Sequence, residues 1–311
     1  MIEIKQYACE YRSVWDEFVE HSKNGTFMLK RDYMDYHSDR FIDNSLMFYK
    51  DKKLIALLPA NINQSVLYSH QGLTYGGIIL GERNKTLDSI FLFETLLSYL
   101  KSKEIHKFIY KRIPHIYHQY PSEEDLYCLF KYGGHLCRRD ISTTIKLSNK
   151  LRFSKSKKNG VAQANRSNVV VCENYDYSYF FEMEKKVLKR HKAKPVHTAE
   201  EMKVLASKFP NNIRLFCSKY KGDIISGVLV YSTEKCAHLQ YIANSEMGKK
   251  IGGLDIIIQH LVEKEYRNKD YFDFGISTES NGYILNEGLI AQKEMFGGRA
   301  ICYDQYELEI K

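Results

Sequence analysis

The chain has 311 residues, and at roughly 100–200 residues per domain this length predicts about two domains. Hydrophobic residues make up 44% and charged residues 27%, which excludes a disordered chain, and only 5 prolines and 18 glycines exclude a collagen-like one. The formal net charge of +8 is concentrated, because residues 146–194 hold 13 Lys and Arg against 4 Asp and Glu. Such a segment can attract an anion, such as a nucleotide, a phosphate-bearing substrate, RNA or a membrane surface, or it can be a solvated connecting helix.

Targeting and metal signals are absent from the sequence. The sequence has no run of about 18 apolar residues, so we expect no membrane-spanning helix. The charged start MIEIKQYACEYRSVW is not typical of a signal peptide. Seven scattered cysteines without a CxxC pair fit reduced thiols, so we expect a cytoplasmic protein. His115 and His118 lie just after Pro114, outside any predicted helix and without a clear third ligand, so we expect no metal site.

Hydrophobic periodicity and turn residues predict the same order of elements twice along the chain. In the first half we expect strands at 2–7, 45–49, 53–61, 66–68, 107–112 and 139–147, and helices at 11–21, 87–100 and 126–132. In the second half we expect helices at 151–168, 177–191, 198–209, 253–266 and 289–296, and strands at 168–172, 213–219, 223–231, 236–243, 271–276 and 299–310. The recurrence predicts an α+β (mixed α/β) fold with two similar domains, 1–147 and 148–311, the second beginning with the basic connecting helix.

One strand-to-helix connection has features of an anion cradle. We expect strand 236–243 to enter a glycine-bearing loop that opens a helix near Gly253. The first N–H groups of a helix have no internal partner, and together with the helix dipole they suit a pyrophosphate. Gly248 and Gly252 allow close backbone approach, and Lys249 and Lys250 add positive charge. The alternative is an ordinary connection with a glycine hinge.

Polar residues follow the strand 271–276, and ligands often bind just beyond the carboxyl end of a strand. Ser277 and Thr278 are candidate substrate contacts, and Glu279 is the candidate general base, acting through water on an ammonium nucleophile. Asp273, in the middle of the strand, must be paired or line a cavity, and a structural pairing is the alternative to function.

Tyrosines and a few residues around the last helix complete the second-half candidates. Tyr241 or Tyr283 could protonate a leaving thiolate, or simply pack, and Asn286 is a candidate substrate contact. Lys293 and Glu294 could form a surface pair or a structural lock between the last helix and the final strand.

The first half has its own cluster of unusual residues. The loop SHQGLTYGG contains His70 and Tyr75, and Arg112 follows the next helix and strand. Glycine-rich loops often line a site, so we interpret these three residues as acceptor contacts in a cleft between the two domains. A hairpin with a buried histidine is the alternative.

Two segments carry a resemblance to a known family. The stretch LQYIANSEMGKKIGGLDIIIQHLVEKEYRNKDYFDFG resembles the core of a GCN5-related N-acyltransferase (GNAT) domain. The C-terminal NEGLIAQKEMFGGRAICYDQYEL resembles the closing part of FemAB-type and related tandem acyltransferases. The QxxGxG/A signature of simple acetyltransferases is imperfect here, since the chain offers Gly248-Lys249-Lys250-Ile251-Gly252-Gly253.

The resemblance implies two tandem GNAT-like domains, each a mainly antiparallel sheet flanked by helices, and an acyltransferase. It implies that the turn at Gly248–Gly253 holds the pyrophosphate of acetyl-CoA or another acyl-CoA, and that the strand around Ala243 and Asn244 pairs with the pantetheine arm. The acceptor would be a small amine, such as an amino sugar or sugar nucleotide of surface-polysaccharide synthesis in the cell envelope. The alternatives are FemAB-like transfer from aminoacyl-tRNA to a peptidoglycan precursor, which the absence of a sustained heptad stretch disfavours, and a non-catalytic binding module.

Overall fold

The computed structural model describes residues 2–189 and 196–311. The chain forms two compact units: unit 1 comprises Met1–Asp140, Ser280–Tyr283 and Cys302–Lys311, and unit 2 comprises Ile141–Glu279 and Ile284–Ile301. The end of the chain therefore returns to the unit that its beginning forms. The division between residues 147 and 148 stays a prediction. In the described part of the chain, no helix combines the length and the apolar character needed to cross a membrane.

Unit 1 contains two sheets and four α-helices among its described residues. Its elements are β1 (Ile2–Gln6), α1 (Arg12–Glu20), α2 (Arg31–Met34), β2 (Ile42–Asp43), β3 (Leu46–Lys50), β4 (Lys53–Leu58), β5 (Asn61–Asn63), β6 (Val66–Tyr68), β7 (Ile79–Leu80), α3 (Thr86–Ser102), β8 (Lys107–Lys111), α4 (Glu124–Lys131), the first half of β9 (His135–Lys146) and most of β17 (Arg299–Glu309). The strand orders are β1-β3-β4-β7 and β2-β5-β6-β8-β17-β9. Leu92, Leu96 and Leu100 recur at helical spacing along α3 and pack with Phe108 and Leu308 in the core of this unit.

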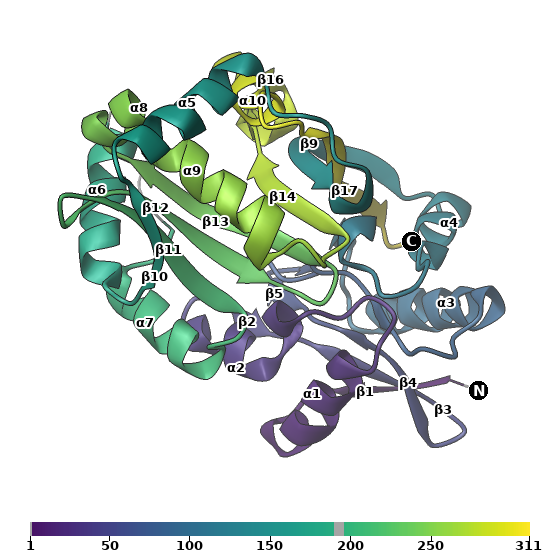
Figure 1. The fold of residues 1–311 in the computed structure, drawn as a ribbon. Helices are drawn as coiled ribbons and strands as arrows, with labels where there is room; N and C mark the ends of the chain where they lie inside the picture. The colour runs from purple at the N-terminus through teal and green to yellow at the C-terminus, as the bar shows by residue number, and fades with distance from the viewer. Residues whose placement is uncertain (1, 190–195) are drawn as a thin grey trace. The chain divides into compact units, whose positions relative to one another are not determined.

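Unit 2 is a sheet with helices on both faces (Figure 1). Its elements are α5 (Lys155–Arg166), β10 (Val170–Asn174), α6 (Tyr177–Lys189), α7 (Ala199–Lys208), β11 (Ile213–Tyr220), β12 (Asp223–Ser232), β13 (Cys236–Asn244), α8 (Glu246–Ile251), α9 (Gly253–His260), a π-helical turn (Leu261–Glu265), β14 (Tyr271–Ile276), β15 (Thr278–Glu279), β16 (Ile284–Leu285) and α10 (Glu287–Glu294). The strand order is β10-β11-β12-β13-β14, followed by the second half of β9.

Alternation along the strands assigns each helix of unit 2 to a face of the sheet. Val228 and Val230 of β12 pack in one apolar cluster with Ile257 of α9. Gly227 and Tyr231, which directly precede and follow this pair, contact α6 and α7 instead. α5 packs beside α9, so the unit has three layers: α5 and α9, the sheet, and α6 and α7.

The structure confirms the predicted mixed fold, with mainly antiparallel sheets flanked by helices, and it corrects three elements. The prediction of a loop between residues 244 and 253 is wrong, because Glu246–Ile251 form a short helix, α8. Ser245 caps this helix by accepting a hydrogen bond from the Gly248 N–H. The last helix begins at Glu287 rather than at residue 289, and the helix expected at 253–266 changes to a π-helical turn after His260. The helix expected at 177–191 is α6, which is described to Lys189; residues 190 and 191 lie outside the described residues.

Candidate active site

A gap between β13 and β14 is the main feature of unit 2. The two strands pair in parallel only from Cys236 to His238, opposite Tyr271 to Asp273. From Leu239 to Asn244, β13 pairs with β12 on one side, and among the described residues no strand lies along its other edge. β14 bends at Gly275, whose φ of 76° is in the left-handed region that favours glycine. The backbone groups along this edge of β13 are therefore available to a ligand.

A buried carboxylate lies where the gap begins. Asp273 is fully buried and accepts hydrogen bonds from Ser142 Oγ (2.5 Å), Thr144 Oγ1 (2.6 Å) and His238 Nδ1 (2.7 Å). Burial alone would raise its pKa, but the hydrogen bond and the charge of His238, with the two hydroxyls, lower the pKa below its ordinary value. The structural pairing considered for Asp273 is present, with a histidine and two hydroxyls as partners.

Lys293 of α10 closes the end of β14. Its buried Nζ donates to the carbonyl oxygens of Gly275 (2.7 Å) and Ile276 (2.8 Å) and to Ser277 Oγ (2.9 Å). Burial lowers its pKa to about 8, although the nearby Asp273 acts in the opposite direction. The prediction that Lys293 forms a surface ion pair is wrong, because its side chain is buried. Its hydrogen bonds join α10 to the end of β14, whereas we expected a link between this helix and the final strand.

The α6 face of the sheet holds a second polar group. Tyr241 shares a hydrogen bond of 2.6 Å with His197 Nδ1, and its ring contacts Phe181 of α6 at 5.5 Å. Glu184 lies one turn beyond Phe181 on the same face of α6, and only 3% of its surface is exposed. Burial raises the pKa of Glu184 to about 8, and its Oε2 atom has no hydrogen-bond partner. His238 and Asp273 point to this same face, because they alternate with the residues that face α9.

The predicted pyrophosphate glycines lie in a tight helix crossing. A Cβ at Gly252, where φ is 76°, would meet the carbonyl oxygen of Gly160 in α5 at 2.1 Å. A Cβ at Gly253 would meet Ser226 Oγ at 2.5 Å, and one at Gly248 would be 2.3 Å from Asn244 Oδ1. Packing therefore requires glycine at all three positions, and their role in holding a cofactor stays a prediction.

The other predicted cofactor residues surround these glycines. Lys249 and Lys250 are exposed on α8, and Lys249 is paired with Glu246 at 3.1 Å. Ala243 is buried in β13, and Asn244 accepts a hydrogen bond from Ser226 Oγ (2.7 Å). The structure thus brings these residues to one end of β13, beside the gap.

The residues predicted beyond β14 are partly brought together. Ser277 is buried against Lys293. The exposed Glu279 accepts a hydrogen bond from Asn286 Nδ2 (3.0 Å) across the short β15–β16 pair that contains Thr278. Tyr283 is 86% exposed. Their catalytic and substrate-binding roles stay predictions.

The three residues predicted from unit 1 are each buried there. Tyr75 donates a hydrogen bond to Thr26 Oγ1 (3.0 Å), Arg112 pairs with Glu123 (2.7 Å), and the ring of His70 lies 5.5 Å from that of Phe41. These contacts account for their burial, and a role in holding the acceptor stays a prediction. The described residues contain no group of three His, Cys, Asp or Glu side chains arranged to hold a metal ion.

Sequence reasoning missed His238, His197 and Glu184. The signal for His238 is its position in an apolar strand, opposite the strand that holds Asp273. The signal for Glu184 is helical spacing, because it follows Phe180 and Phe181 by four and three residues and so falls on their buried face. His197 follows residues outside the described part of the chain, and no local pattern points to Tyr241 as its partner.

Three-dimensional comparisons identify the fold. The chain is similar to FemX, with a TM-score of 0.69 and 10% sequence identity over 99% of this chain and 97% of that chain. It is also similar to L-PGS from Bacillus licheniformis (TM-score 0.62, 12% identity, 98% and 92% covered) and to a tandem GNAT protein from the clavulanic acid biosynthesis pathway (0.53, 9%, 100% and 100%). The chain has a tandem GNAT, FemAB-like fold. No family model and no curated protein matches the sequence. Identities this low show the tandem GNAT fold alone.

Proposed function

We propose that the protein is an acyltransferase that moves an acyl group from acetyl-CoA or another acyl-CoA to an amine. The observation that carries this proposal is the edge of β13 between Leu239 and Asn244, along which no other described strand pairs. A pantetheine arm can add to such an edge much as a peptide strand does. A backbone N–H near Ala243 or Asn244 would then polarise the thioester carbonyl in the manner of an oxyanion hole.

Unit 1 supports placing the donor in unit 2. Its parallel pair, β6 with β8, also spans three residues, from Val66 to Tyr68. There the chain turns away at His70, where φ is 64°, and Lys111 Nζ donates to the carbonyl oxygens of His70, Gln71 and Leu73. β6 therefore offers no long free edge, whereas β13 continues for six residues beyond its pairing with β14.

In the reaction, the amine nitrogen attacks the thioester carbonyl carbon, a C–N bond forms, the C–S bond breaks and coenzyme A leaves as the thiolate. The ammonium proton must first go to a base. Glu279 can take it through water, as the sequence suggests, and the buried Glu184 offers a second carboxylate on the α6 face. Tyr241 or Tyr283 would return a proton to the thiolate. Holding the two substrates together supplies much of the rate.

The finer assignments extend this proposal. Gly248, Lys249, Lys250, Gly252 and Gly253 would lie at the pyrophosphate end of the donor. Contacts to the acceptor would come from a larger set: His70, Tyr75, Arg112, Ser277, Thr278 and Asn286. We propose an amino sugar or sugar nucleotide of cell-envelope polysaccharide synthesis as the acceptor, and a cytoplasmic location.

Isothermal titration with acetyl-CoA tests the donor. We expect the double variant K249E/K250E to weaken binding by about tenfold or more, because two positive charges near the pyrophosphate are reversed. The matched control is K101E, which reverses a charge on α3 of unit 1 and should leave the affinity unchanged. If the wild-type protein binds no acyl-CoA, the proposal fails, and binding of charged tRNA instead would favour aminoacyl transfer. Tight ligand binding without any turnover would favour a non-catalytic module.

Substitutions of the two carboxylates separate the candidates for the base. If Glu184 is the base, kcat/KM of the wild type rises as the pH increases towards 8. A Glu184→Gln variant should then bind acetyl-CoA normally but lose both turnover and this pH dependence. A Glu279→Gln variant that binds acetyl-CoA normally but loses turnover identifies Glu279 instead. Glu182→Gln, which changes an exposed carboxylate on α6, is the control for both.

A further inference from the structure

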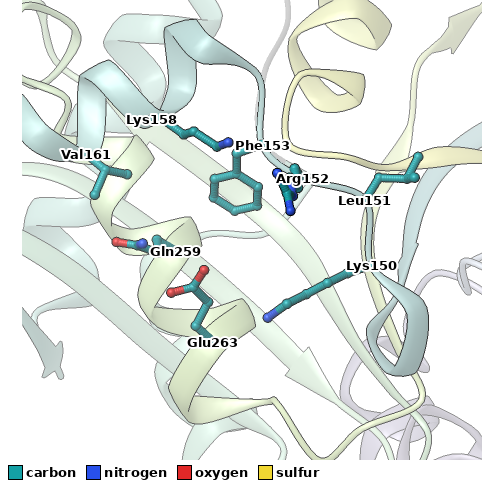
Figure 2. Close-up of a pocket in the computed structure, with 8 residues that line it drawn as sticks. All are labelled: Lys150, Leu151, Arg152, Phe153, Lys158, Val161, Gln259 and Glu263. Atoms are coloured by element: carbon teal, nitrogen blue, oxygen red, sulfur yellow. The ribbon is translucent and has the colours of Figure 1, made fainter.

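A cavity of about 270 Å³ lies on the opposite face of unit 2 from α6. Three segments form its walls: the chain entering α5, α5 itself, and the C-terminal part of α9 with the π-helical turn (Figure 2). The lining residues are Lys150, Leu151, Arg152, Phe153, Lys158, Val161, Gln259 and Glu263. The volume is near the lower end of the range for small-molecule sites, roughly 300–1,000 Å³.

Three cations of this cavity have no acidic partner among the residues that the structure describes. Within the described residues, no hydrogen bond or ion pair is made by the side chains of Lys150, Arg152 and Lys158. Lys157, in the same basic segment, differs: its Nζ binds Asp255 at 2.9 Å and lies 4.5 Å from the centre of the Phe296 ring. In the basic segment, Lys157 therefore takes part in packing, whereas Lys150, Arg152 and Lys158 line an open cavity.

The other walls restrict what these cations can bind. Phe153 packs edge-on against Phe296 with ring centres 5.3 Å apart, and it presents a fixed apolar surface. Glu263 lies on the wall opposite Lys150 (Figure 2), and together with Gln259 it can accept hydrogen bonds. A carboxylate at this position repels a continuous polyanion and favours a ligand that has one anionic end and donor groups at the other.

We propose that this cavity binds a small phosphate monoester with hydroxyl or amino groups, either a sugar phosphate or a nucleotide. The phosphate lies among Lys150, Arg152 and Lys158, where charge-assisted hydrogen bonds are strongest. The body of the ligand rests on Phe153, and its hydroxyl or amino groups donate to Glu263 and Gln259.

The Glu263 wall of this cavity is distant from the donor gap. Gly253, at the donor end of α9, and Glu263 are roughly 15 Å apart along the helix axis at 1.5 Å per residue. We therefore expect the phosphate ester and acetyl-CoA to bind without displacing each other. The inference depends on the cavity and not on the identity of the acyl donor.

Titration calorimetry at low salt with glucose 6-phosphate, adenosine 5′-monophosphate and inorganic phosphate tests the proposal and separates its two sources. We expect at least one ester to bind more tightly than inorganic phosphate. Arg152→Ala and Lys158→Ala should each weaken the binding of that ester by about tenfold. Lys155→Ala, which removes an exposed charge from the same helix outside the cavity, should change the affinity by less than about twofold.

A second variant tests the carboxylate. Glu263→Gln should tighten the binding of inorganic phosphate several-fold by removing repulsion, with a smaller gain for the ester, which loses a charged acceptor. The proposal is overturned if no phosphate compound binds, if Lys155→Ala weakens binding as much as Lys158→Ala, or if saturating acetyl-CoA displaces the ester. Binding of a single-stranded RNA with a steep salt dependence, in the absence of ester binding, would also overturn it.

Discussion

Asp273 shows how one residue joins three strands of unit 2. Its carboxylate receives hydrogen bonds from Ser142 and Thr144 of β9 and from His238 of β13. The pKa of Asp273 is lowered, so its stabilising contribution is present above the ordinary carboxyl pKa of about 4 and is lost as the pH falls below that value. The start of the gap is therefore held by a charge that acid removes.

We predict that Asp273→Asn destabilises the protein by about 2–4 kcal/mol at neutral pH, because the buried donors lose their charged acceptor. Urea unfolding measures this change, and the difference between variant and wild type should shrink in acid. Asp270→Asn, which removes an exposed carboxylate paired with Lys235, should cost less than about 1 kcal/mol. Equal effects of the two substitutions would contradict the role given to Asp273.

Glu184 has the opposite pH dependence. Burial raises its pKa to about 8, so between its ordinary pKa and about 8 the folded protein keeps a proton that the unfolded chain loses. Stability therefore falls as the pH rises through this interval. We predict that Glu184→Gln is more stable than wild type at pH 8, by up to a few kcal/mol, and that the advantage disappears near pH 4. Thermal unfolding across this pH range measures it, with Glu182→Gln expected to show no such trend.

At the scale of elements, α5 can cross α8 and α9 closely because glycines, which have no side chain, lie at the crossing. Gly160 faces Asp255, and Gly252 faces the carbonyl of Gly160, with almost no room for a Cβ at either position. We predict that Gly160→Ala and Gly252→Ala each destabilise the protein by about 1–3 kcal/mol. Gly288→Ala on the exposed start of α10, where the nearest atom is 3.9 Å away, should be neutral or slightly stabilising in the same urea titrations. A neutral Gly252→Ala would show that this crossing tolerates a side chain.

The sequence predicted elements well where a regular period marked them. The boundaries of β14 are those expected, and α3 and β12 differ from expectation by one or two residues. α8 was missed because its six residues hold a glycine and two lysines, with no apolar stripe long enough to predict a helix. The same glycines suggested a cradle for an anion, and only the position of α5 shows that they are needed for packing.

At the scale of the molecule, contacts between residues distant in sequence were beyond sequence reasoning. The pairings of Asp273 with Ser142 and of Tyr241 with His197 join segments that no local pattern relates. The return of the last strand to unit 1 is a similar case. A period of two residues predicts that a strand exists and which of its faces is buried, but it does not predict the neighbouring strands.

This return makes unit 1 dependent on the end of the chain. β17 lies between β8 and β9, Leu308 is buried in the unit 1 core, and Arg139 pairs with Asp304 at 2.7 Å. We predict that a fragment of residues 1–147 alone lacks a cooperative unfolding transition, because β8 loses its antiparallel partner and keeps only β6, and the core loses one wall. The same fragment joined by a flexible glycine-serine linker to residues 299–311 should regain the transition in circular dichroism. Cooperative unfolding of the unlinked fragment would show that the first 147 residues hold a complete core without β17.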